Sequence, residues 1–166
     1  DRVFIDSENS EQLIRLLFKD RIHRSSSPLN LAPIERVLDW CNGNQDRVQK
    51  VAVAVSAYTT LDKEAQSLGN PKKVALSGHI TSLLDVAEDN VAIVETIFSR
   101  SFPSSWSDSL ADILEVRSKA FAELLNHDSS KVQEIAKNKL SLLKRRIREE
   151  KEREAEENNQ REQRFE

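Results

Sequence analysis

Apolar residues recur along this chain at the spacing of one face of an α-helix, with turn residues between the apolar stretches. A first amphipathic stretch covers about residues 7–23, and a Ser-rich linker follows at 24–30. Three pairs of amphipathic stretches then fill residues 31–147, and a polar turn divides each pair. These turns are Asn42-Gly43-Asn44, Glu88-Asp89-Asn90 and Asn126-His127-Asp128, and the second helices are expected to start at Asp46, Val91 and Ser130. The pairs are expected to begin near three prolines, Pro33, Pro71 and Pro103.

This pattern predicts an all-α protein of seven helices and no strand. The Val-Ala-Val-Ala-Val run at 51–55 resembles a strand in isolation, but its place in a helical pair favours a helix. We expect that helix to start at Asp46 and to fade after Asp62, and the next helix to include Val74 and Leu76. Ser105, with Asp108 three residues later, is the expected cap of the third pair.

The apolar pattern stops after Ile147. From 148 to 166 only Ala155 and Phe165 are apolar, while residues 144–166 carry eight basic and eight acidic side chains. Such a segment cannot bury a core, so we expect a solvated helical extension or a disordered tail. The predicted organisation is therefore an N-terminal helix and linker at 1–30, a helical domain at 31–147 and a charged tail at 148–166. A coiled coil through this tail is an open alternative, although it lacks an apolar seam.

One short run of residues recurs in the second helix of the pairs. Its clearest copy consists of Asp128, Val132-Gln133, Ala136 and Leu140. A less complete copy occurs 84 residues earlier as Asn44, Val48-Gln49 and Ala52, and a third, weaker copy is centred on Val91. A unit that returns every 41 to 43 residues is typical of a stacked helical repeat.

The copy at 128–140 resembles the HEAT-repeat (armadillo-like) family, whose motif has Asp at the turn, Val-Arg at the second helix, then Ala and Leu. Gln133 stands where that family usually has Arg, and Ser56 and Glu95 replace the apolar residue in the other copies. The resemblance implies a short right-handed α-α solenoid of about three helix pairs. Members of the family are mostly scaffolds; some are joined to NTPase or effector domains, including in bacterial defence proteins, and a few act on DNA as glycosylases.

The amino-acid composition limits the partners and the cellular location that can be expected for this chain. The 166 residues carry a net charge of −3, which does not favour general attraction to nucleic acid or to an acidic membrane. Cys41 is the only cysteine, so an internal disulfide is excluded, and no apolar run reaches the roughly 18 residues of a membrane span. We expect a soluble, cytoplasmic chain. Because it starts at Asp1 and contains no Met, we expect it to be the C-terminal part of a larger protein.

No arrangement of residues predicts catalysis. The three histidines lie far from one another and from Cys41, and the three glycines form no phosphate-binding loop. His127-Asp128 beside Ser129-Ser130 suggests a catalytic triad, but neighbours in one short turn rarely form such a relay. We therefore expect neither an enzyme nor a cofactor or metal.

The expected function is a non-catalytic protein-protein interaction or scaffold module that binds another protein or another domain of its own polypeptide. Its candidate contact residues are polar positions on second helices and one tryptophan near a helix start: Lys50, Trp106, Glu134, Lys137 and Asn138. The alternative is a nucleic-acid-binding domain that uses the basic cluster Lys144, Arg145, Arg146 and Arg148. No membrane partner is expected.

Overall fold

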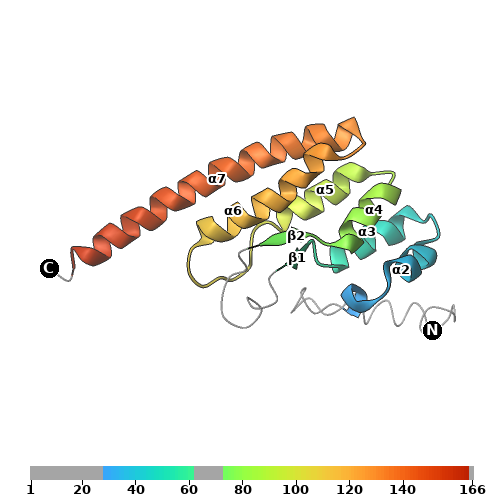
Figure 1. Ribbon diagram of the computed structural model, residues 1–166, viewed down its shortest axis with the longest axis horizontal. Coiled ribbons are helices and arrows are strands. Elements are labelled where there is room, and N and C mark those ends of the chain that lie inside the picture. The colour runs from blue at the N-terminus through green and yellow to red at the C-terminus, as the bar shows by residue number, and fades with distance from the viewer. Residues whose placement is uncertain (1–27, 62–72, 165–166) are drawn as a thin grey trace. The chain divides into compact units, whose positions relative to one another are not determined.

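The computed structural model describes residues 28–61 and 73–164, in which six α-helices and one small sheet occur (Figure 1). The helix expected at 7–23 lies outside these residues. In chain order the elements are η2 (Pro28–Leu31, a 3-10 helix), α2 (Ile34–Cys41), α3 (Gln45–Ala54), β1 (Tyr58–Thr60), β2 (Val74–Leu76), α4 (Gly78–Val86), α5 (Asn90–Ser99), α6 (Leu110–Phe121), the 3-10 helix η3 (Ala122–Asn126) and α7 (Ser130–Glu162). The expectation of a mostly helical protein is confirmed, whereas the expectation of no strand was wrong.

The chain divides into two compact units. Unit 1 comprises the described residues up to Ala57 together with Ser77–Thr96, and unit 2 comprises Tyr58–Leu76 and the chain from Ile97 onward. Helix α5 begins in unit 1 and ends in unit 2.

In unit 1, α2, α3 and α4 contact one another. Helix α2 ends where predicted, because Asn42 (φ 44°) and Gly43 (φ 69°) adopt the left-handed conformation that these two residue types tolerate best. The cap of α3 is Asn44, whose side-chain oxygen accepts a hydrogen bond from the backbone N–H of Arg47 at 3.1 Å, rather than the expected Asp46. The 51–55 run is helical up to Ala54, as predicted.

Helix α3 ends eight residues earlier than its sequence suggested. Side chains take over the backbone groups of Ser56: the Asn30 Oδ1 accepts from its N–H at 2.8 Å, and the Ser77 hydroxyl donates to its carbonyl at 2.5 Å. These bonds come from residues 21 and 26 positions away, so helix propensity within the segment could not reveal them.

Residues predicted to start the next helix instead form a strand. β2 pairs with β1 in antiparallel register, with Tyr58 opposite Leu76 and Thr60 opposite Val74. Helix α4 begins only at Gly78, where the Ser77 hydroxyl accepts from the Ile80 N–H at 3.3 Å and provides the cap. The pattern of a short Val-Ala-Leu run is compatible with either a helix or a strand, and here its pairing with β1 makes it a strand.

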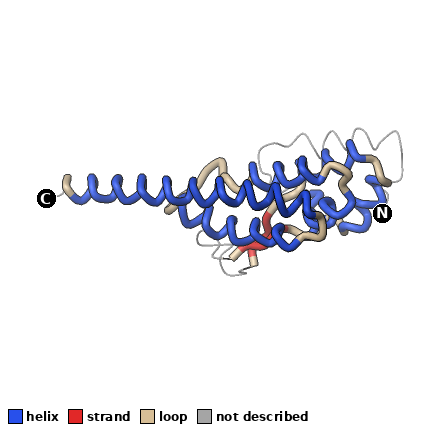
Figure 2. Tube along the Cα trace, turned by 90° about the horizontal axis from the view of Figure 1, so that it is seen from above, coloured by secondary structure: helices blue, strands red, loops and turns tan. Residues whose placement is uncertain are grey.

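Unit 2 contains an antiparallel helical hairpin of α6, η3 and α7, which all contact one another. The face of α7 that packs against α6 and η3 has apolar residues at spacings of three and four. The buried members of this seam are Val132, Ala136, Leu140, Leu143 and Ile147. At the far end of this seam Ile147 packs with Leu110 and Leu114 of α6. Figures 1 and 2 show α7 as one uninterrupted helix whose last turns extend past the start of α6.

Helix α6 starts at Leu110 and not near Pro103, so residues 103–109 are a loop. Its cap is Ser109, whose hydroxyl accepts from the Asp112 N–H at 3.0 Å, in place of the expected Ser105. The turn before α7 falls where the sequence placed it, and Gln133 donates from its side chain to the His127 carbonyl at 2.7 Å.

Replacement of Leu143 by Ala should lower the free energy of unfolding by about 2–5 kcal/mol, because its side chain is fully buried in the seam. The matched control is Leu142→Ala on the same helix, where the side chain is 39% exposed and the loss should stay under about 1 kcal/mol. Urea unfolding followed by circular dichroism measures both. Equal losses would contradict the seam.

Candidate interaction surface

The side of α7 that faces away from the seam is exposed and polar. Three of the predicted partner-binding residues, Glu134, Lys137 and Asn138, lie on it. Two others lie elsewhere: Trp106 is in the loop before α6 with 48% of its surface exposed, and Lys50 is an exposed residue of α3 in unit 1. Helix α7 and the loop at 103–109 therefore form the candidate interaction surface of unit 2.

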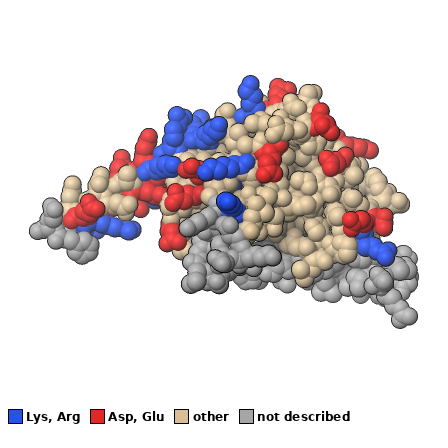
Figure 3. Space-filling view, in the orientation of Figure 1, with Lys and Arg blue, Asp and Glu red and all other residues tan. Residues whose placement is uncertain are grey.

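Charge is segregated along α7. Residues 131–148 carry seven basic side chains and one acidic side chain, whereas residues 149–162 carry seven acidic and three basic ones. Figure 3 shows Lys and Arg over the middle of α7, with Asp and Glu beside them toward its C-terminal end. A partner that docks along α7 would meet a positive surface followed by a negative one.

The basic cluster proposed for nucleic acid sits at the junction of these two parts. Arg145 and Arg146 both pair with Glu149, at 3.8 and 3.5 Å, and Arg146 also pairs with Glu150 at 2.5 Å. Within the described ranges, Lys144 and Arg148 have no ion pair. Half of the cluster is therefore engaged by carboxylates one turn away, which weakens its attraction for phosphates.

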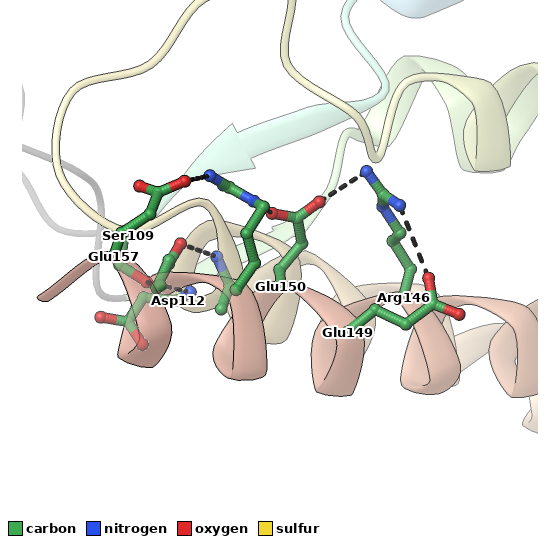
Figure 4. A network of polar contacts seen from close by, with 9 residues as sticks. Ser109, Asp112, Arg146, Glu149, Glu150 and Glu157 are labelled. Carbon is green, nitrogen blue, oxygen red and sulfur yellow. Dashed lines mark hydrogen bonds and ion pairs between the residues drawn. The ribbon is translucent and has the colours of Figure 1, made fainter. Parts of the chain in front are cut away.

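Glu150 continues the seam of α7, three residues after Ile147, yet it carries a charge and only 2% of its surface is exposed. Arg146 and Arg153 flank its carboxylate at 2.5 and 2.7 Å, and both arginine side chains are about half exposed. Figure 4 shows Arg146 beside Glu150. Arg153 also reaches Glu157 one turn further on. Ion pairing with both arginines makes burial of this carboxylate possible at a place where the apolar pattern has ended.

Glu154, four residues later, holds the start of α6. One of its oxygens accepts from the Ser109 hydroxyl at 2.7 Å and the other from the Ala111 backbone N–H at 3.2 Å. The first N–H groups of a helix have no partner within it and carry partial positive charge, so a carboxylate is the natural acceptor. Lys151 adds a contact between the two helices through Glu115 at 2.8 Å.

The pKa values of these carboxylates follow from their contacts. Partial burial alone would raise the pKa of Glu154, but hydrogen bonds from Ser109, Ala111 and Leu110 outweigh it and hold the pKa below its ordinary value. The hydrogen bond and charge of Lys151 likewise lower the pKa of Glu115. Both groups are therefore charged at neutral pH.

A second polar cluster of unit 2 joins β1 to α6 and to the end of α5. The Tyr58 hydroxyl and the Ser101 hydroxyl are 2.6 Å apart, and the Arg117 guanidinium lies 5.7 Å from the centre of the Tyr58 ring. Arg117 also donates to the carbonyls of Arg100 and Ser101, at 3.2 and 3.1 Å, just beyond the end of α5. Burial raises the pKa of Tyr58 to about 12, despite the opposing effects of Ser101 and Arg117.

Sequence reasoning missed both polar clusters. For Glu150 and Glu154 a signal existed, because they extend the three-and-four spacing of the seam from Leu143 and Ile147. Their charge, however, predicts a solvated tail. Tyr58 falls within the helix that the sequence predicts from Asp46 to Asp62, and nothing near it in the sequence indicates Ser101 or Arg117 as neighbours.

Comparison with protein-family models, with curated proteins and with solved structures finds no match to this chain. Across residues 28–61 and 73–164, no three His, Cys, Asp or Glu side chains are grouped so that they could hold a metal ion. No helix in the same ranges has both the length and the apolar character needed to cross a membrane.

Replacement of Glu154 by Gln should destabilise the chain at pH 7 by about 1 kcal/mol, a modest value because the carboxylate is partly solvated. Because the folded-state pKa is lowered, the stabilisation is complete above the ordinary value near 4.5 and is lost as pH falls through the folded-state pKa. The gap between variant and wild type in the free energy of unfolding should therefore close as the pH is lowered. Chemical unfolding at a series of pH values measures it, with the exposed Glu156→Gln as control; a gap that persists unchanged at pH 3 would contradict the assignment.

The only tyrosine of the chain makes its titration directly assignable. We expect the phenolate absorbance near 295 nm to appear with a midpoint of about 12 in the folded protein and near 10 after denaturation. By linkage, the contribution of Tyr58 to stability is intact below pH 10 and is lost as pH rises toward 12. A folded-state midpoint near 10 would show that the hydroxyl is solvated.

Proposed function

We propose that this chain is a non-catalytic protein-binding module, in which α7 and the loop at 103–109 provide the contact surface for another protein or another domain of the same polypeptide. The supporting observation is that α7 continues through Glu162, although its apolar seam ends at Ile147 and, among the described residues, its last hydrogen bond to α6 is made by Glu154. The side chains at 155–162 are all exposed. A helix extended in this way adds surface without adding core.

The loop before α6 contributes an apolar element to this surface. Trp106 exposes 48% of its surface, and Phe102, directly before the loop, exposes 39%. Tryptophan is among the residue types most often responsible for strong binding at interfaces. Charged rims mainly set partner choice and orientation, which suits the ordered positive and negative parts of α7. An aromatic anchor with a charged helix nearby is a common composition for a specific protein contact.

We also propose that the pairs α2–α3, α4–α5 and α6–α7 are HEAT-like repeats. In support, the second helices begin within one residue of the expected starts, and the repeated positions Val48, Ala52, Val132, Ala136 and Leu140 are buried. The β1–β2 pair and the length of α7 are additions to such a repeat plan.

The test is affinity capture from an extract of the source cells, with bound proteins identified by mass spectrometry. Trp106→Ser, or Lys137→Glu with Glu134→Lys, should remove at least one partner that wild type retains, by about tenfold or more. Glu123→Lys in η3 is the matched control, since it changes an exposed charge outside this surface. If all variants keep the same partners, the assigned surface is wrong.

A further inference from the structure

Beyond Ile147 the attachment of α7 to α6 changes in kind. No apolar side chain of α7 is buried after that residue, and the contacts that follow are the carboxylate bonds of Glu154 to Ser109 and Ala111 and the ion pair of Lys151 with Glu115. Water and dissolved ions compete with each of these contacts, whereas they do not weaken an apolar seam in the same way.

The two helices respond differently if these contacts break. Helix α6 retains its cap, because the Ser109 hydroxyl still accepts from the Asp112 N–H. The residues of α7 after Ile147 then have only helical hydrogen bonds and exposed pairs such as Arg153 with Glu157. A helical segment of about 15 residues without packing is marginally stable in water.

We infer that residues 148–162 form a latch: a segment that opens as one cooperative unit while the seam from Val132 to Ile147 stays closed, and whose opening also uncovers the first N–H groups of α6. The placement of Glu150 agrees with a latch that is kept openable. It occupies a buried seam position where an apolar side chain would hold the helices more firmly than a paired charge does. This inference concerns the chain alone and stands or falls independently of the proposed binding function.

One amide reports the latch directly. The Ala111 N–H lies in the first turn of α6, has no partner within its own helix, and is protected by Glu154 alone. The Asp112 N–H beside it is protected by Ser109 and provides an internal control. Hydrogen exchange of single amides, measured by NMR on the full chain, therefore separates opening of the latch from unfolding of the hairpin.

We expect the Ala111 amide and the amides of 150–158 to exchange at similar rates, faster than the amide of Leu143. Lys151→Ala does not touch Ala111, yet it should raise the exchange rates of the Ala111 amide and of the 150–158 amides together by about threefold. A rise in NaCl from about 0.05 to 0.5 M should have the same effect. Glu150→Leu should slow both by about tenfold. The Asp112 amide should change by less than about twofold throughout.

Two results would overturn the latch. The first is an Ala111 amide that is insensitive to Lys151→Ala and to salt, since the contacts would then act independently. The second is protection of 150–158 equal to that of Leu143, since α7 would then open only with the whole hairpin. If a substitution disturbs folding, the salt series on the wild-type protein still tests the latch, because it requires no substitution.

Discussion

Unit 2 depends on one constraint: α7 must bury an apolar stripe that covers only about half of its length. The stripe from Val132 to Ile147 packs in the hairpin with α6 and η3, and this burial fixes the direction and register of both helices. Hydrophobic stabilisation is proportional to the apolar area that is buried, so it ends where the apolar side chains of α7 end. The remaining turns of α7 must be held by other means or left free.

The other means are electrostatic and local. Glu154 meets the positive end of α6, and Glu150 is neutralised by arginines one turn before and one turn after it. The acidic residues that follow the seam thereby serve the fold as well as the surface. Arginine suits this arrangement because its aliphatic stem can cover the buried carboxylate while its guanidinium remains in water.

The sequence predicted what local pattern controls, namely the three helix pairs, the turn at Asn42-Gly43 and the buried stripe of α7. It did not predict β1 and β2, because strands of three residues have too short a pattern and depend on partner residues 14 to 18 positions away. It also misplaced Glu154, whose hydrogen-bond partner Ser109 is 45 positions earlier. Charge alone indicated solvent exposure there, whereas the contact with a helix start depends on tertiary structure. The contact residues on α7 were identified as exposed polar positions, and their role stays a prediction.

The extension of α7 has a mechanical consequence. A continuous helix rises about 1.5 Å per residue, so Glu162 stands roughly 22 Å from Ile147 along a stiff rod. A tilt of about 10° at Ile147 would displace that tip by roughly 4 Å, close to the spacing of adjacent Cα atoms. The helix can thus act as a lever arm that converts a small repacking around Leu110 and Leu114 into a displacement large enough to change which side chains a bound neighbour meets.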